Sequence, residues 1–351
     1  MDHTKKTSYF FAIDALRVLS ILAVIFIHST TKTLANIDHN VIEGAFSLFL
    51  NQSSRFAVPL FFLISGFVLE LNNRKLPYLT FFRKRATRIL LPFIFWSVFY
   101  LYIGNGNLQK LFSFDFINAL ISGKAAYHLY FIPALVVFYL AFPLLHHLLT
   151  LFKDFWFFSF MWLVQFLLLF YDYYTQPLRV DPTLRIVYLV FAMFITGMVA
   201  SHIKDSLLQF VKKYFIFLAT LLILLSGIIF FHVVELTTTR HTTSYIYNQH
   251  SPLNYLYTLV LALVGSYIFD KTKFLERIVK LMSRLSFFVF FIHVFILDTL
   301  WNTFIKPQIV DSDKMLKQVW FDPLFFIAIS SISFGIAYII HKLPYAAKVT
   351  G

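Results

Sequence analysis

The sequence predicts an all-α protein that crosses a membrane many times. Hydrophobic residues make up 59% of the 351 residues and charged residues only 13%, well below the roughly 25% charged residues of an average soluble domain. Apolar runs of about 18 to 22 residues recur along the chain, and each is long enough to cross about 30 Å of hydrocarbon as a helix. We therefore expect one polytopic helical bundle over residues 1–351, without a soluble domain.

Ten membrane spans follow from the apolar runs and the polar breaks between them. The predicted spans are 9–29, 43–71, 89–104, 127–149, 154–171, 183–203, 214–232, 252–269, 285–304 and 321–341. The second is long enough to begin as an amphipathic segment at the membrane surface. The first is charged within and lacks a small-residue cleavage pattern, so we interpret it as a retained span and not as a signal peptide.

The distribution of Lys and Arg predicts that both termini are cytoplasmic. With the N-terminus inside, the inner segments hold 19 of the 30 basic residues, the outer segments hold nine, and Arg17 and Arg55 lie within spans. An excess of positive charge marks cytoplasmic loops. The expected location is a cell membrane, and a bacterial cytoplasmic membrane in particular.

Charge and cysteine content narrow the partners and the chemistry. The net charge of +13 follows from the short basic loops, so the lipid bilayer is the expected partner and nucleic acid is not. The chain has no cysteine, which excludes thiolate nucleophiles and Cys-based metal sites. The histidines lack the paired spacing of a zinc motif, so no metal site and no bound cofactor are expected.

The first span carries a polar stripe made of Asp14, Arg17 and His28. Arg17 and His28 are eleven positions apart, which places them on one face of a helix and about 16 Å apart along its axis. Asp14 precedes Arg17 by three residues, a spacing at which the two side chains can pair. Ionisable groups in a span are costly and usually line a protein interior or a wet cavity. We therefore expect the stripe to line a cleft that crosses much of the bilayer.

Five segments resemble acyltransferase family 3, a family of integral-membrane proteins. The run IDALRVLSILAVIFIHS resembles its first helix, in which an Arg and a His are separated by ten residues, here Arg17 and His28. The other similar segments, in chain order, are VPLFFLISGFVL at 58–69, FFRKRATRILLPF at 81–93, AYHLYFIPALVVFYL at 126–140 and LSFFVFFIHVFIL at 285–297. Departures are Tyr130 in place of a common Trp and Phe287–Phe288 in place of Tyr-Gly.

The resemblance implies an O-acyltransferase that uses cytoplasmic acyl-CoA as donor and a hydroxyl of a cell-envelope glycan or exopolysaccharide as acceptor. The acyl group would be acetyl or succinyl. The chain resembles the small members associated with exopolysaccharide or intercellular-adhesin modification, which lack a fused SGNH domain. The membrane domain itself would then complete the transfer or hand it to another protein. The rival hypothesis is an exporter of a polysaccharide or lipid-linked sugar that uses the polar stripe as a passage.

Three residues are the predicted catalytic set. His28 is the candidate general base for the acceptor hydroxyl, because a neutral imidazole near pH 7 can take that proton and later return it. An acyl-histidine intermediate is the open alternative. Arg17 would hold the CoA side of the cleft, and Asp14 would fix its guanidinium.

A second set is predicted to bind substrate. Arg85 and Arg88 match an Arg-x-x-Arg pair of the family and could grip the phosphates of coenzyme A, although a basic loop also satisfies membrane topology. Arg55 could meet His28 or reach the outer membrane boundary. His128 and His293 take their place from the similar segments, and His293 is interpreted first as a structural polar contact. Four further histidines, expected to be solvated at the inner boundary, are His146, His147, His202 and His341.

Overall fold

The computed structural model describes residues 11–37, 42–73, 77–105, 113–151, 155–174, 182–235, 237–238, 250–309 and 313–343. Residues 9, 10 and 154 of the predicted spans lie outside these ranges. All regular secondary structure in the described part is helical, without any strand, so the predicted all-α fold is confirmed.

The described chain is built mainly of α-helices. In chain order they are α1 (Phe11–Leu34), α2 (Ile42–Ser53), α3 (Ala57–Asn73), α4 (Tyr78–Arg85), α5 (Leu91–Asn105), α6 (Phe114–Ser122), α7 (Phe131–Leu151), α8 (Phe155–Tyr174), α9 (Pro182–His202), α10 (Lys204–Lys213), α11 (Phe215–Glu235), α12 (Pro252–Lys271), α13 (Glu276–Leu300) and α14 (Phe321–His341). Two π-helical turns continue α4 and α13, namely η1 (Ala86–Leu90) and η5 (Trp301–Ile305). Three short 3₁₀ turns are η4 (Lys273–Leu275), η6 (Lys306–Gln308) and η7 (Asp313–Met315).

Nine helical segments of the described chain are long and apolar enough to cross a membrane, and the predicted fifth span corresponds to a shorter apolar stretch, Phe158–Asp172, within α8. The protein is thus a multi-pass membrane protein. Two predicted boundaries are wrong by several residues. The segment that matches the predicted ninth span begins at Glu276 and not at 285, and the one that matches the predicted third span begins at Tyr78 and not at 89. Both helices extend past the apolar run into the basic inner loops.

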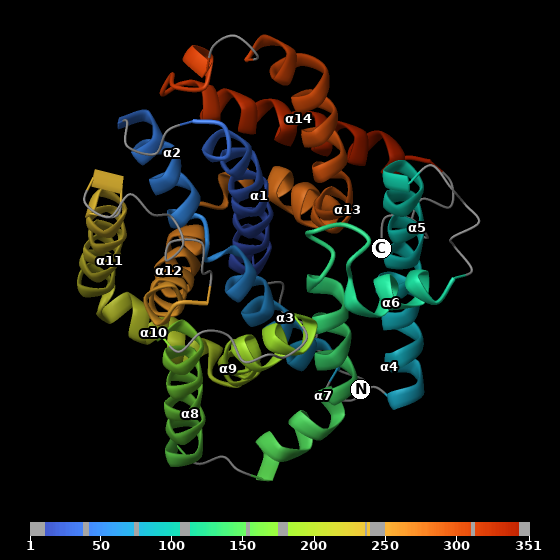
Figure 1. The fold of residues 1–351 in the computed structure, drawn as a ribbon. Coiled ribbons are helices and arrows are strands. Elements are labelled where there is room, and N and C mark those ends of the chain that lie inside the picture. The colour runs from blue at the N-terminus through green and yellow to red at the C-terminus, as the bar shows by residue number, and fades with distance from the viewer. Residues whose placement is uncertain are drawn as a thin grey trace.

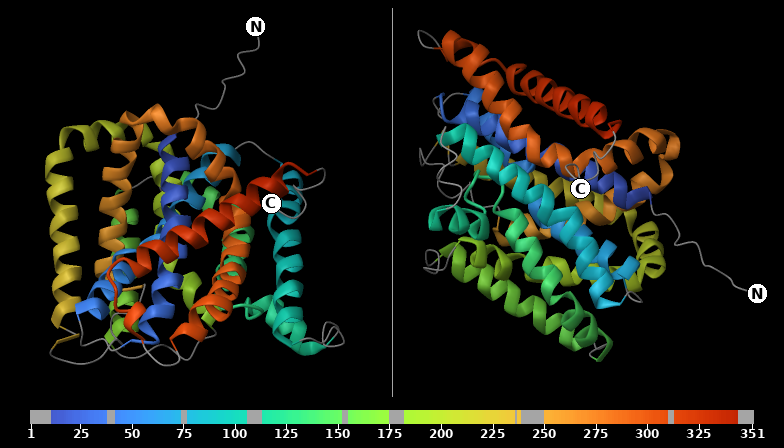
Figure 2. Two further views of the ribbon diagram at one scale, coloured as in Figure 1. Left: turned by 90° about the horizontal axis from the view of Figure 1, so that it is seen from above. Right: turned by 90° about the vertical axis from the view of Figure 1, so that its right-hand side faces the viewer.

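Helix α1 occupies the centre of the bundle. Figure 1 shows it enclosed by α2, α3, α12 and α13, and about two thirds of its most apolar window is buried inside the protein. The left view of Figure 2 shows α1, α11 and α12 standing nearly parallel, whereas α14 runs obliquely across the bundle. A helix in this position cannot turn its polar stripe to lipid, so the stripe predicted on α1 faces protein.

The second predicted span is broken into α2 and α3 by a turn at Ser54–Phe56. The break lies inside the protein, where other groups take over the freed backbone, as is required at membrane depth. Asn254 on α12 donates its Nδ2 to the carbonyl oxygen of Arg55 at 3.0 Å. The break therefore presents Arg55 toward the core next to the outer half of α1.

Helices α3 and α9 cross with their backbones in contact at two glycines. A Cβ added to Gly66 would overlap the carbonyl of Phe194, and one added to Gly197 would overlap the carbonyl of Leu63. Small residues allow this close approach between membrane helices, where van der Waals packing supplies most of the attraction. The crossing fixes the position of α3, whose side chains line the site described next.

Candidate active site

The inner end of α1 forms a compact polar cluster with α13. Arg17 Nη1 donates to Asp14 Oδ1 at 3.1 Å and to Ser283 Oγ at 2.9 Å, and Ser283 Oγ donates to the same Asp14 oxygen at 2.5 Å. The side chains of Arg17 and Asp14 are only 28% and 20% exposed. The predicted pairing is confirmed, and Ser283, which the motif comparison did not single out, completes it.

A cavity of about 650 Å³ opens beside this cluster. Its cationic lining comes from Arg17 of α1, Arg85 and Arg88 of α4 and η1, and Arg284 of α13, and His341 at the end of α14 also lines it. These groups are far apart in sequence, and all lie at ends that the charge distribution assigns to the cytoplasm. The structure thus brings the two predicted substrate-binding arginines and Arg17 to one cavity.

Arg85 is held at the cavity by aromatic rings. Its guanidinium carbon lies 5.6 Å from the ring centre of Phe81 and 5.4 Å from that of Tyr139, distances at which cation–π attraction is effective. A π-helical turn follows directly at Ala86–Leu90. Pro92 lacks the N–H that would serve the carbonyl of Arg88 in a regular helix, which accounts for the altered turn. Arg85 and Arg88 therefore both line the cavity.

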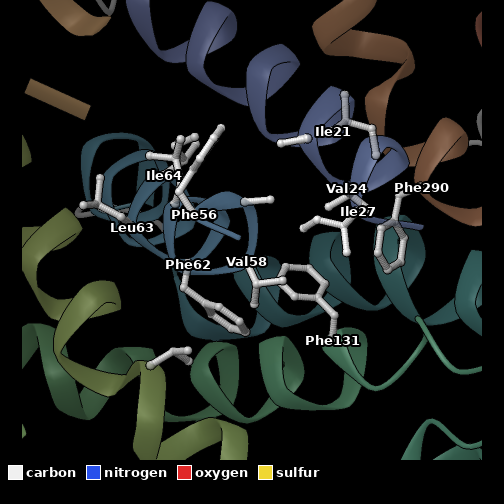
Figure 3. Packing of buried hydrophobic residues seen from close by; sticks show 14 of the residues in the cluster. Ile21, Val24, Ile27, Phe56, Val58, Phe62, Leu63, Ile64, Phe131 and Phe290 are labelled. Atoms are coloured by element: carbon white, nitrogen blue, oxygen red, sulfur yellow. The ribbon is translucent and has the colours of Figure 1, made fainter. Parts of the chain in front are cut away.

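The opposite end of the cavity is apolar. The outermost lining residue on α3 is Phe61, on α7 it is Phe131 and on α13 it is Phe290. The ring centre of Phe131 lies 5.8 Å from that of Phe61 and 5.6 Å from that of Phe290. We call these three residues the aromatic floor. Figure 3 shows Phe131 and Phe290 in the buried cluster that also contains Ile27 and Val58.

Three histidines gather beyond the aromatic floor. The rings of His28 and His293 stack with centroids 5.4 Å apart and planes 30° apart, and His128 meets His293 edge-on at 5.2 Å. Phe290 joins the floor to this group, since its ring lies 5.4 Å from that of His128 and 6.2 Å from that of His293. The histidine cluster of His28, His128 and His293 thus combines the predicted base with two predicted substrate-binding residues.

The hydrogen bonds of His293 define its tautomer. Its Nδ1 lies 2.8 Å from the carbonyl oxygen of Phe290 and 3.1 Å from that of Val289. Carbonyl oxygens only accept, so Nδ1 carries the proton and a neutral ring keeps a lone pair on Nε2. That Nε2 is buried and meets no hydrogen-bond partner among the described residues. An unused acceptor beside His28 is costly in a core and is typical of a functional site.

His128 reaches the cluster from a turn before α7, not from within a helix as predicted. Gly123 ends α6 with a φ of 65°, a left-handed conformation that glycine adopts without strain. A Cβ there would also overlap the backbone of Tyr130. The turn after Gly123 therefore packs tightly. It places the ring of His128 against that of His293. It also places the ring of Tyr127 5.0 Å from that of His28.

Arg55 is tied to the outer end of α1 through Asn51. Arg55 donates to Asn51 Oδ1 from Nε at 3.0 Å and from Nη2 at 2.8 Å. Asn51 Nδ2 donates in turn to the carbonyl oxygen of Ile27 at 3.0 Å and to Thr30 Oγ1 at 2.9 Å. Arg55 is therefore joined through Asn51 to the helical turn of α1 that carries His28.

The expected cleft is divided. The cavity includes Arg17 but ends at the aromatic floor, and His28 is not part of its lining. The reason is that Phe131 and Phe290 fill the space between them, being only 8% and 7% exposed. Arg17 and His28 thus face one interior from opposite sides of a wall of phenyl rings.

Two of the histidines expected to be solvated, His146 and His202, are also partners of a buried acid. Glu70, at the inner end of α3, has a side chain that is 0% exposed. His146 Nδ1 lies 3.0 Å from both carboxylate oxygens, and His202 Nε2 lies 2.8 Å from one of them. His202 is exposed, as expected, whereas His146 is only partly exposed, and the contact of both with Glu70 was not predicted. His147 and His341 are exposed, as expected.

Known proteins are similar to this chain over most of its length. Proteins of Staphylococcus aureus strains MSSA476, MW2 and MRSA252, each described as a probable poly-β-1,6-N-acetyl-D-glucosamine export protein, are 23% identical to this chain over 305 residues. The similarity covers 82% of this chain and 83% of each relative. No solved structure matches the chain significantly. The acyltransferase domain that defines acyltransferase family 3 matches residues 10–342, and this chain therefore belongs to that family.

Proposed function

We propose that the protein transfers a short acyl group from cytoplasmic acyl-CoA to a hydroxyl of a cell-envelope glycan, with the histidine cluster at the point of transfer. One observation carries the proposal. A cavity with a cationic mouth ends at a phenyl ring, Phe290, that also contacts His128 and His293. A donor entering from the cytoplasmic end would thus arrive one side chain from the histidine that stacks on His28.

The cationic mouth suits coenzyme A. Arg85 and Arg88 can bind phosphate oxygens through paired N–H groups, and Arg17 lies deeper on the same cavity. Arg17 and His28 are about 16 Å apart along α1. The flexible pantetheine arm separates the phosphates of coenzyme A from its sulfur. With the phosphates at the mouth, the thioester would lie at the aromatic floor.

The reaction needs one proton acceptor near the acceptor hydroxyl. His28 would take the hydroxyl proton while the oxygen attacks the thioester carbon. The tetrahedral intermediate then expels the coenzyme A sulfur, which takes the proton from the imidazolium, leaving an ester and free coenzyme A. The unpartnered Nε2 of His293 beside His28 would favour the positive charge that His28 carries in between. In the alternative route His28 itself accepts the acyl group and passes it to the hydroxyl.

The acceptor class follows from the relatives. Their description refers to a polymer of β-1,6-linked N-acetylglucosamine, whose free hydroxyls are chemically suitable acceptors. That description also favours the second candidate, export of such a polymer. The two candidates differ in what they require, since the exporter needs neither an acyl donor nor a proton-accepting histidine at the outer end of α1.

The test uses purified protein in lipid nanodiscs with radiolabelled acetyl-CoA and β-1,6-linked N-acetylglucosamine oligosaccharides. We expect label to reach the glycan with the wild type and to be lost with His28→Ala. His147→Ala is the matched control, because this histidine is exposed and lies away from the cavity. In proteoliposomes, glycan transport that proceeds without acetyl-CoA and survives His28→Ala would favour the exporter and contradict the transferase.

A further inference from the structure

We propose that the aromatic floor of Phe61, Phe131 and Phe290 restricts the donor to a short, uncharged acyl group, so that acetyl is accepted and succinyl or longer acyl groups are rejected. This inference rests on the proposed function and names the acyl group that the same site transfers.

The depth order of the cavity lining supports this assignment. On α13 the lining runs from Ser283 and Arg284 through Phe287 to Phe290, and on α7 it runs from Tyr139 through Leu135 to Phe131. Hydroxyl and guanidinium groups occupy the inner end, and the outermost residue is a phenylalanine on each helix. A thioester bound with its phosphates at the mouth therefore presents its acyl end to phenyl rings.

The chemistry of the floor disfavours a charged acyl group. A succinyl group would bring a carboxylate against phenyl rings, which offer it neither a hydrogen bond nor a countercharge. No cation lines this end of the cavity among the described residues, and an unpaired charge in such a place is strongly disfavoured. An acetyl group has only a methyl to place there and meets no such cost.

The packing of the aromatic floor limits the length of the acyl group. Phe131 and Phe290 are almost fully buried and touch each other. The cavity ends at these packed rings, so the acyl group has only the space that a small displacement of the ring of Phe290 provides. A methyl fits there readily, whereas each further methylene must displace packed side chains at additional cost.

The test is a series of donors offered to the wild-type protein in nanodiscs, with the same oligosaccharide acceptor. The donors are acetyl-, propionyl-, butyryl-, hexanoyl- and succinyl-CoA. For the wild type we expect kcat/KM to fall by about tenfold or more from acetyl to butyryl, and transfer from hexanoyl- and succinyl-CoA to be at background. Phe290→Ala should reduce the acetyl to butyryl preference by about tenfold while still rejecting succinyl, because the enlarged space remains without a cation.

Phe295→Ala is the matched control. It lies on the same helix, is half-buried and packs on Phe99, and it does not line the cavity. Its ratio of acetyl to butyryl transfer should equal that of the wild type. Phe290→Leu and Phe131→Leu, which remove less volume, take the place of Phe290→Ala if that variant does not fold.

A binding measurement distinguishes a failure of the proposed acyl transfer from a failure of the proposed selectivity for acetyl. Thermal unfolding is recorded with free coenzyme A and with unreactive thioether analogues carrying ethyl, butyl or carboxypropyl groups. If neither coenzyme A nor any analogue stabilises the protein and no donor transfers, the proposed function fails. Suppose instead that coenzyme A stabilises the protein and acetyl is transferred. Only the present inference is then overturned if the wild type uses butyryl or succinyl equally well, or if the Phe290 and Phe131 variants keep the wild-type ratio of acetyl to butyryl transfer.

Discussion

His28 on α1 and His293 on α13 stack with ring centroids 5.4 Å apart, and His293 directs its Nδ1 proton to the backbone of its own helix. The pairing leaves one unused nitrogen lone pair beside the candidate base. It also brings the late Phe-Phe-Ile-His segment to a candidate site that begins on the first helix.

Replacing His293 with Phe tests this relationship. The variant keeps an aromatic ring against His28 but loses the Nε2 acceptor, so we predict a fall in kcat of about 10², with the KM for acetyl-CoA unchanged because the donor cavity is intact. The pH profile of kcat should also shift, which a purely packing role would not produce. Full activity in His293→Phe would assign His293 to packing alone.

The basic mouth predicts an effect on donor affinity. Arg88→Ala should raise the KM for acetyl-CoA by about tenfold, equivalent to about 1.4 kcal/mol, with little change in kcat. Arg85→Lys should do the same despite keeping the charge, because an ammonium group offers neither the planar fork nor the stacking on Phe81 and Tyr139.

Arg83→Ala is the control for this pair. It is exposed in the same basic helix and does not line the cavity, so it should leave the KM at the wild-type value. Steady-state kinetics at two salt concentrations measures all three variants. An equal rise in KM for Arg83→Ala would show that the loss of donor affinity comes from the overall charge of the basic loop and not from specific contacts of Arg85 and Arg88.

Sequence reasoning predicted the chemistry of single helices well. Local spacing determined that Asp14 pairs with Arg17, and the cost of a charge in hydrocarbon determined that the stripe faces inward. The aromatic floor could not be predicted, because Phe61, Phe131 and Phe290 come from three helices. In a chain with 46 Phe, nothing local distinguishes these three.

Contacts between distant helices limited the rest of the prediction. The Glu70 contacts with His146 and His202 join α3, α7 and α9, and no spacing along one helix can indicate them. The break between α2 and α3 was missed because the polar run at residues 51–55 was included in one long span. Contacts from another helix, such as that of Asn254 with the carbonyl oxygen of Arg55, help to make the turn acceptable inside the protein.

Asn51 should act as a positioning residue for His28. Asn51→Ala removes the amide that joins Arg55 to the carbonyl of Ile27, leaving buried groups unpaired, so we predict a loss of about 1–3 kcal/mol in unfolding free energy. The kcat should also fall, since the turn bearing His28 loosens, while the KM for acetyl-CoA stays constant. Asn72→Ala, which removes an exposed hydrogen bond to Val68, should change neither the unfolding free energy nor kcat. Equal effects of Asn51→Ala and Asn72→Ala would contradict the positioning role of Asn51.

Glu70 is predicted to stabilise the inner ends of three helices. Glu70→Gln keeps the shape but replaces one carboxylate oxygen with a donor that faces imidazole N–H groups, so the thermal midpoint in detergent should fall. The cost should be about 1–3 kcal/mol, below the cost of breaking a fully buried ion pair, because His146 and His202 are 24% and 40% exposed. Glu276→Gln, in a surface pair with Lys280, should shift stability by about 0.5 kcal/mol or less.

The glycine crossing of α3 and α9 gives the sharpest structural prediction. Gly66→Ala and Gly197→Ala each place a methyl on the backbone of the opposing helix, so the helices must separate, at a cost of about 1–3 kcal/mol in unfolding free energy. Because α3 carries Phe61 of the aromatic floor, separation should also lower transfer activity. Gly227→Ala is the matched control: its Cβ would meet open space on α11, and alanine favours the helix by about 1 kcal/mol. The thermal midpoint in detergent should therefore fall for the first two variants and hold or rise for the third, and a midpoint unchanged in Gly66→Ala would contradict the observed crossing.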